Sequence, residues 1–140
     1  MNEPFSVRFT VRSYEIDTLG HLNGAHYVSY ADHTRYECAR AAGADPERLR
    51  QARVGPVNLD TTIRYRGELR FGDEIDVTCA FLWGDGKTFR AQQEFRRPDG
   101  TVAAEVVSVC GLLHLDERRR LPDPVETWRA LATTPEILGL

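Results

Sequence analysis

The stretch Glu15-Ile-Asp-Thr-Leu-Gly-His-Leu-Asn-Gly-Ala-His-Tyr27 decides the fold, because it joins an alternating segment to a long run of helix-forming residues. Before it, residues 6–12 alternate polar and apolar side chains, which predicts a half-buried strand. Asn23 is a favourable N-cap, and residues 24–42 contain no proline or interior glycine to interrupt a helix. The stretch therefore places the carboxylate of Asp17 near the free backbone N–H groups of a helix start.

The rest of the chain is dominated by strands. After a short charged segment at residues 45–53, apolar side chains recur at every second position, which is the period of a strand. The last strand is apolar on both faces, which is typical of a strand inside its sheet. Because one helix cannot cover both sides of such a sheet, we expect the second face to meet another subunit. The predicted elements are strands at 57–65, 75–83, 89–95 and 101–115, and a short helix at 123–132.

This order of elements predicts an α+β fold, in which an antiparallel five-stranded sheet wraps around one long central helix. The chain of 140 residues shows no internal repeat and no linker, so we expect a single domain of residues 1–140 with a core at about 5–125. Small side chains dominate the helix face that is predicted to pack on the sheet, with Tyr27 alongside. This predicted face comprises Gly24, Val28, Ala31, Arg35, Cys38 and Ala42.

Composition excludes several classes of protein. Hydrophobic residues make up 41% and charged residues 28%, which is an ordinary globular balance. No apolar run is long enough to span a membrane and the N-terminus lacks the pattern of a signal peptide, so we expect a cytoplasmic protein. The net charge of −3 argues against a general nucleic-acid surface. Three scattered cysteines and four histidines without metal-ligand spacing predict neither disulfides nor a metal site.

The segment from Asp17 to Tyr27, with its Asp-x-x-Gly-His-x-Asn pattern, resembles the hotdog-fold acyl-CoA thioesterases of the 4-hydroxybenzoyl-CoA thioesterase type. A second segment, Ile63-Arg-Tyr-Arg-Gly-Glu-Leu-Arg-Phe-Gly-Asp73, is similar to a strand of that family and the Gly-Asp turn that follows it. The resemblance covers about residues 5–125. It implies a hotdog fold and the hydrolysis of an acyl-CoA or acyl-carrier-protein thioester.

The resemblance also implies roles for individual residues. Asp17 matches the catalytic carboxylate, and the amide that polarises the thioester carbonyl is, by position, the backbone N–H of Gly24. Asn23 is expected to cap the helix and, secondarily, to position a water or Asp17. Relatives of this type work as dimers or tetramers with the substrate between subunits, and they use no cofactor or metal.

The chemistry of a thioester agrees with such a site. Its leaving thiol has a pKa of about 8.5, so little general-acid help is needed. The site must stabilise an oxyanion, which helix amides do, and deliver a nucleophile. An ionised Asp17 can attack the carbonyl directly or activate a water, and both roles stay open. The predicted substrate-binding residues also include Tyr27, which is expected to line the acyl pocket, and His21. The resemblance further implies that Arg64, Lys87 and Arg90 bind the phosphates of CoA, because they lie on or beside strands that contact this part of the substrate in relatives.

Other functions remain open at this stage. A hotdog hydratase or dehydratase typically pairs an aspartate with a histidine, and His21 lies four residues after Asp17. A non-catalytic module would bind acyl-CoA and release no thiol. The three consecutive arginines at 118–120 indicate a solvated turn or, alternatively, a docking patch for a carrier protein. The acyl chain, the choice between CoA and a carrier protein, and the choice between dimer and tetramer do not follow from the residues.

Overall fold

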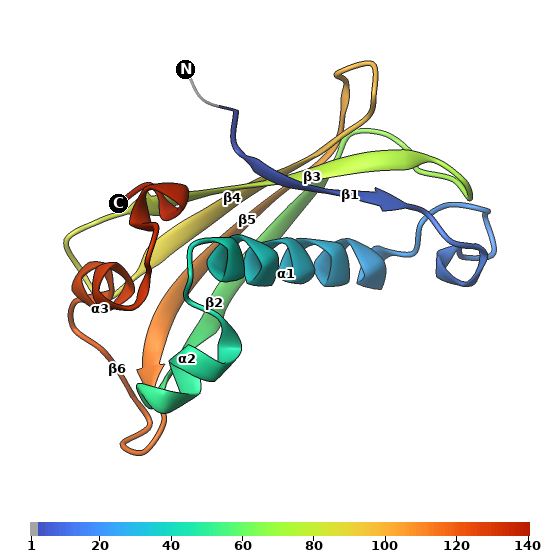
Figure 1. Cartoon of the computed structure of the whole chain (residues 1–140). Helices are drawn as coiled ribbons and strands as arrows, with labels where there is room; N and C mark the ends of the chain where they lie inside the picture. The colour runs from blue at the N-terminus through green and yellow to red at the C-terminus, as the bar shows by residue number, and fades with distance from the viewer. Residues whose placement is uncertain (1–2) are drawn as a thin grey trace.

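A computed structural model describes residues 3–140, and its elements follow the predicted order (Figure 1). The predicted domain of residues 1–140 begins two residues before the described part. The elements are β1 (Phe5–Thr10), η1 (Ser13–Glu15), α1 (Gly24–Ala41), α2 (Pro46–Gln51), β2 (Val54–Tyr65), β3 (Glu74–Trp83), β4 (Phe89–Arg96), β5 (Val102–His114), β6 (Arg119–Arg120), α3 (Pro124–Leu131) and η2 (Pro135–Leu138).

The sheet is antiparallel, and its strands lie in the order β1-β3-β4-β5-β2. It curls around α1, while α2, α3 and η2 gather near the C-terminal end of that helix (Figure 1). This arrangement confirms the predicted α+β hotdog architecture. The additional strand β6 pairs with the end of β5, and its two residues are too few to show a period. None of the helices in residues 3–140 has the length and apolar character needed to cross a bilayer.

The long helix begins and ends where its flanking residues dictate. The Oδ1 atom of Asn23 accepts a hydrogen bond from the Ala25 N–H at 3.0 Å, which caps the first turn. At the other end, Gly43 has a φ of +90°, a left-handed conformation that favours glycine. A Cβ on Gly43 would lie 2.1 Å from the hydroxyl of Thr133, so the glycine also lets the C-terminal segment approach the helix.

The core lies between α1 and the concave face of the sheet. Phe95 on β4 is fully buried, and its ring lies 5.2 Å from the ring of Tyr27 and 6.3 Å from that of Tyr30. Gln93 on the same strand donates its Nε2 hydrogen to the carbonyl of Ala31 at 2.9 Å, which ties the sheet to the helix. The three cysteines are buried as free thiols, as expected for core residues: Cys38, Cys79 and Cys110.

The buried face of α1 differs in part from the predicted one. Tyr30 and Thr34 are buried, whereas Gly24 is exposed and Val28 is 39% exposed. The polar groups of the buried pair find partners, because Thr34 donates to the carbonyl of Tyr30 and Tyr30 donates to the carboxylate of Glu15. Both sets of positions have helical spacing, so periodicity alone could not choose between them. The predicted positions Ala31, Cys38 and Ala42 are buried as expected.

The packing of Phe95 predicts a large effect on stability. Replacing Phe95 by alanine should lower the free energy of unfolding by about 3–5 kcal/mol, because a cavity replaces a fully buried ring. Phe71 is 63% exposed, so Phe71→Ala should change that free energy by about 0.5 kcal/mol or less. Urea unfolding followed by circular dichroism measures both, and equal losses would contradict the assignment of the core.

Candidate functional site

The loop that carries Asp17 is a small hairpin before α1. Ile16 pairs with Leu22 across it, and the Asp17 N–H donates to the carbonyl of His21 at 2.8 Å. Gly20 donates its N–H back to the carbonyl of Asp17 at 3.0 Å, and its φ of +79° suits glycine. The hairpin therefore holds Asp17 in a defined position close to the helix start.

The two carboxylate oxygens of Asp17 differ in their surroundings. Oδ1 accepts backbone hydrogen bonds from Leu19 at 2.9 Å and from His21 at 3.2 Å, as a turn-forming aspartate does. Oδ2 has no hydrogen-bond donor among residues 3–140, and the side chain is half-buried. One oxygen thus organises the loop, while the other is available to a substrate or a water.

The first amide of α1 is unpaired. Asn23 uses its side-chain oxygen for the Ala25 N–H and its carbonyl for the His26 N–H, while Gly24 is exposed. Within the described part of the chain, no acceptor faces the Gly24 N–H. The Tyr65 hydroxyl oxygen lies 3.4 Å from the position that a Cβ on Gly24 would occupy. A phenol and a free helix amide therefore border the same space.

Tyr27 and Arg97 complete this end of the molecule. The ring of Tyr27 is buried and meets the ring of Tyr65 edge to face, with centroids 5.1 Å apart. Burial raises the pKa of Tyr27, nearby Tyr65 and Asp17 act in the same direction, and the cationic Arg97 opposes them. The ring contact places Tyr65 beside Tyr27 at the start of α1, and the charges of Asp17 and Arg97 act on Tyr27 from nearby. Tyr65 and Arg97 were not predicted, because only the folded chain brings their distant segments toward this end of the helix.

Two acidic residues support the loop. His21 turns its ring toward Glu68, with Nε2 3.2 Å from Oε2. Glu15 is buried, and one of its oxygens accepts hydrogen bonds from the Arg12 N–H at 2.8 Å and from the Tyr30 hydroxyl at 2.5 Å. Burial by itself raises the pKa of Glu15, but these two hydrogen bonds and the charge of Arg12 outweigh it and hold the pKa below its usual value.

This balance predicts a pH-dependent contribution of Glu15 to stability. The pKa of Glu15 is lower in the folded protein than in the unfolded chain, so its ionised carboxylate stabilises the fold. This stabilisation is complete at pH values above the unfolded-state pKa, and it is lost as the pH falls through the folded-state pKa. Wild-type protein should therefore melt at a higher temperature than Glu15→Gln at pH 7, with the gap closing in acid below about pH 4. Melting curves at several pH values measure this gap, and a gap that stays constant down to pH 3 would refute the role.

The predicted phosphate-binding residues lie elsewhere in the protomer. Arg64 precedes Tyr65, whose ring faces α1, so Arg64 lies on the opposite face of the sheet. Arg90 lies between two buried residues of β4 and also projects from the outer face. Lys87 belongs to the turn between β3 and β4 and lines a separate groove. Within one protomer, the structure does not bring these three cations to Asp17.

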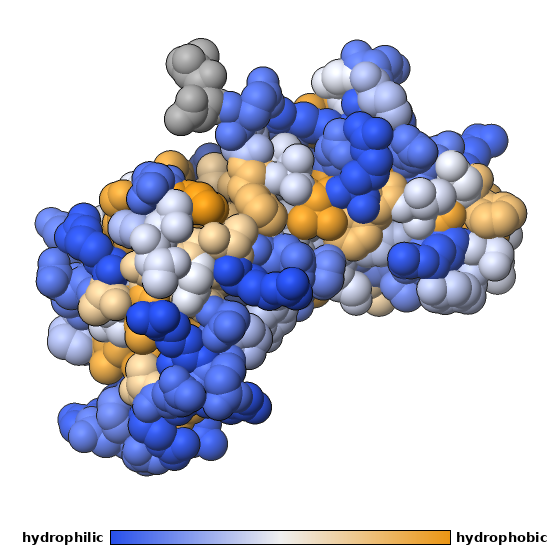
Figure 2. Space-filling model, viewed as in Figure 1, coloured by the Kyte–Doolittle hydropathy of each residue, from blue (hydrophilic) through white to orange (hydrophobic). Residues whose placement is uncertain are grey.

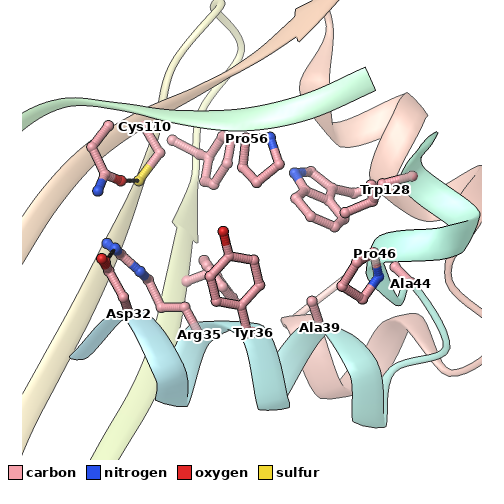
Figure 3. A pocket seen from close by; sticks show the side chains of 13 residues that line it. Asp32, Arg35, Tyr36, Ala39, Ala44, Pro46, Pro56, Cys110 and Trp128 are labelled. Carbon is pink, nitrogen blue, oxygen red and sulfur yellow. Dashed lines mark hydrogen bonds and ion pairs between the residues drawn. The ribbon is translucent and has the colours of Figure 1, made fainter. Parts of the chain in front are cut away.

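A cavity of about 120 Å³ lies beside the second half of α1 (Figure 3). Arg35, Tyr36 and Ala39 reach into it from the helix, and Pro56 and Trp128 close it from β2 and α3. Its walls are mostly apolar, apart from the ion pair between Arg35 and Asp32 and the side chain of Asn58. Buried nitrogens of Arg35 and Trp128 have no acceptor among the described residues. The cavity begins eight residues after Gly24, which is about 12 Å along the helix.

Sequence comparisons identify relatives over most of the chain. A family model described as the thioesterase-like superfamily matches residues 11–132. The chain is 30% identical over 77 residues to an acyl-acyl carrier protein thioesterase, ATL3, chloroplastic, of Arabidopsis thaliana, covering 55% of this chain and 40% of that protein. It is 29% identical over 98 residues to Protein THEM6 of Drosophila melanogaster, covering 69% of this chain and 50% of that protein. The chain thus spans about half the length of these curated relatives or less.

Solved structures share the fold at low sequence identity. A Staphylococcus aureus protein characterised in complex with CoA superposes with a TM-score of 0.82 at 22% identity, over 91% of this chain and 82% of that one. The 1,4-dihydroxy-2-naphthoyl-CoA thioesterase of Synechocystis has a TM-score of 0.80 at 13% identity, over 92% of this chain and 95% of that one. A probable thioesterase of Escherichia coli, YbaW, has a TM-score of 0.75 at 20% identity, over 84% of this chain and 89% of that one.

Proposed function

This chain belongs to the thioesterase-like superfamily, and we propose that it hydrolyses an acyl-CoA or acyl-carrier-protein thioester to a free acid and a thiol. The observation that carries the proposal is that two groups without a partner occur in one short segment, one on the loop before α1 and one on the first residue of that helix. The Asp17 carboxylate keeps an unbonded oxygen, and the Gly24 N–H a few residues later has no acceptor among residues 3–140. The proposed reaction uses no metal and no cofactor beyond the CoA of the substrate.

The Gly24 amide is the proposed donor to the oxyanion. It stands at the positive end of α1, where the helix dipole and the unpaired N–H both favour developing negative charge. One such donor is worth about 10²–10³ in rate. The Tyr65 hydroxyl borders the same space, so the carbonyl oxygen would enter between a backbone amide and a phenol.

Asp17 is proposed to supply or activate the nucleophile. Its free oxygen either attacks the thioester carbonyl and forms an anhydride, or takes a proton from a water that attacks. Asn23 acts first as the helix cap, since its side-chain oxygen is engaged by the Ala25 N–H. The side-chain amide nitrogen of Asn23 is left to orient that water.

The position of His21 favours hydrolysis over the hydratase alternative. A hydratase needs the imidazole to act on the substrate together with the aspartate. Here the His21 ring is directed at Glu68, and Asp17 accepts a hydrogen bond from the backbone of His21 and not from its ring. Thiol release from a saturated acyl-CoA, compared with loss of enoyl absorbance, separates the two reactions.

We further propose that the protein works as a homodimer or a dimer of dimers. β2 is an edge strand of 12 residues, and its unpaired backbone can accept a second copy. Leu59 and Tyr65 on this strand are 47% and 58% exposed, and Val28 and Tyr36 of α1 are exposed as well. Pairing two β2 strands about a twofold axis would cover apolar surface and enclose the helix start.

The cavity beside Trp128, with its mostly apolar walls, is the proposed place for the acyl chain.

The role of Asp17 predicts the behaviour of Asp17→Asn. Asparagine keeps an oxygen that can accept the Leu19 and His21 N–H groups, so the loop should persist while kcat falls by about 10²–10⁴. Asp99 forms a similar turn, accepting the Thr101 N–H at 2.9 Å, so Asp99→Asn is a matched control that should keep its activity. Thiol release from a panel of acyl-CoAs measures both, and full activity of folded Asp17→Asn would exclude the assignment.

The role of the Gly24 amide predicts a difference between two substitutions. Proline is well tolerated at the first position of a helix, and the extended conformation of Asn23 suits a following proline. Gly24→Pro should therefore leave α1 intact, yet lower kcat by about 10²–10³ because it deletes one N–H. Gly24→Ala keeps the N–H and should retain most activity. Similar kinetics for the two folded variants would rule out the amide as the oxyanion donor.

A further inference from the structure

The cavity beside the second half of α1 has a polar end and an apolar end. Figure 3 shows Asp32, Arg35 and Cys110 at one end and Trp128 at the other. The Cys110 thiol donates to Oδ1 of Asn58 at 3.5 Å, so this amide belongs to the polar end. Apolar walls are contributed by Ala39, Ala44, Pro46, Leu49 and Phe89. The volume of about 120 Å³ is close to that of apolar cavities that hold one benzene ring, so several carbon atoms fit inside.

Arg35 brings an unused hydrogen-bond donor to the polar end. Its Nη2 atom donates to the carboxylate of Asp32, whereas Nη1 is buried and has no acceptor among residues 3–140. The side chain of Arg35 is only 14% exposed, so the missing bond lies away from bulk solvent and is costly. A ligand oxygen beside Nη1 would remove that cost. The indole N–H of Trp128, at the other end, has no acceptor among these residues either.

The charges at the polar end favour a neutral oxygen. Asp32 already balances the charge of Arg35, so a ligand carboxylate would meet an anion as well as a cation. A hydroxyl both accepts and donates. It can accept a hydrogen bond from Nη1 of Arg35 and donate its own hydrogen to the carboxylate of Asp32 or to Oδ1 of Asn58, which has a second lone pair.

The surroundings of the cavity favour a small molecule over a protein partner. Pro46 and Leu49 of α2 close one side of it. The outer surface of α2 is largely hydrophilic in Figure 2, so the apolar walls do not continue into an apolar patch on that surface. An enclosed apolar space with a few polar groups is typical of a binding site for part of a small ligand.

Both α1 and β2 extend from the proposed reaction centre to this cavity. Val28 is exposed and lies one turn after Gly24 and one turn before Asp32, on the same helical face. On β2, Tyr65 borders Gly24 and Asn58 lines the cavity. The cavity begins about 12 Å along the helix from Gly24. An extended chain advances by about 1.2 Å per bond, so about ten bonds reach the cavity from the reacting carbonyl.

We propose that the acyl group of the substrate is a long chain that carries a hydroxyl on about its eleventh carbon, and that Arg35 binds this hydroxyl. The short apolar tail beyond the hydroxyl fills the end of the cavity beside Trp128. The inference rests on the proposed thioesterase function and names the class of acyl group, a mid-chain hydroxyacyl group. Arg35 is thus assigned as a specificity-determining residue.

Isothermal titration with tetradecyl pantetheine thioethers tests the inference without any hydrolysis. These ligands carry the pantetheine arm that CoA and carrier proteins share, and they lack a reactive carbonyl. Wild-type protein should bind the thioether with a hydroxyl on its eleventh carbon at least about fivefold more tightly than the unsubstituted one. A hydroxyl on the third carbon should bring no gain, because that carbon does not reach the cavity.

Arg35→Met should bind the substituted and unsubstituted thioethers equally, because methionine is apolar and keeps much of the length of the side chain. Arg40 is the matched control on the same helix. It pairs with Glu37 three residues earlier, as Arg35 pairs with Asp32, but it is 67% exposed. Arg40→Met should therefore keep the preference. Trp128→Phe should keep it as well, since the hydroxyl is assigned to Arg35.

Several results would overturn the inference. Equal binding of all the thioethers by wild-type protein would show that water satisfies Arg35. Tighter binding of a terminal hydroxyl, lost in Trp128→Phe, would assign the oxygen to Trp128 instead, and tighter binding of a terminal carboxylate would exclude a neutral group. If the preference is found but no thiol is released from any acyl-CoA or acyl-carrier protein, the proposed function fails and the binding site stands. If thiol is released but no preference is found, only this inference fails.

Discussion

The buried carboxylate of Glu15 is the interaction on which the helix start depends. It accepts hydrogen bonds from the Arg12 backbone and from the Tyr30 side chain, so it joins the end of the first strand region to the body of α1. The carbonyl of the same residue accepts the N–H of Asn23 at 2.9 Å, immediately before the helix. A buried charge with fewer partners would be costly, and these partners make its burial favourable. Glu15 thereby fixes the distance between the Asp17 loop and the first turn of α1.

Because the loop is anchored in this way, Asp17 can form a turn and still be free for its proposed catalytic role. An aspartate in a flexible loop would satisfy both carboxylate oxygens with nearby amides or with water. In this hairpin, two backbone donors converge on Oδ1 of Asp17 and leave Oδ2 without a partner in the described chain. The same segment leads into α1, whose first N–H, on Gly24, also has no acceptor among residues 3–140. The loop is organised before any substrate arrives, which is the condition under which electrostatic stabilisation is most effective.

Charge is distributed unevenly over the molecule. Most arginines are neutralised locally, as in the pairs Arg8–Asp76 and Arg66–Glu105, and such exposed pairs contribute little to stability. Their effect is to remove positive potential from most of the surface. Among residues 3–140, the cations without an ion pair include Lys87, Arg118 and Arg120, which line one groove, whereas Arg64 and Arg90, which also lack an ion pair, lie outside it.

The sequence by itself determined the order and type of the longer elements, because helix and strand periods, the Asn23 cap and the Gly43 stop are local properties. It also singled out Asp17 and Gly24, since both belong to one continuous segment. The tertiary structure alone decided which face of α1 is buried, because Tyr30 and Thr34 are acceptable inside only when their hydroxyls find partners. It also brought Tyr65 and Arg97 to the helix start, and Lys87 to Arg120 across Gly111. Such contacts depend on strand register and on how closely two backbone segments approach. Neither can be predicted from the periodicity of a single segment.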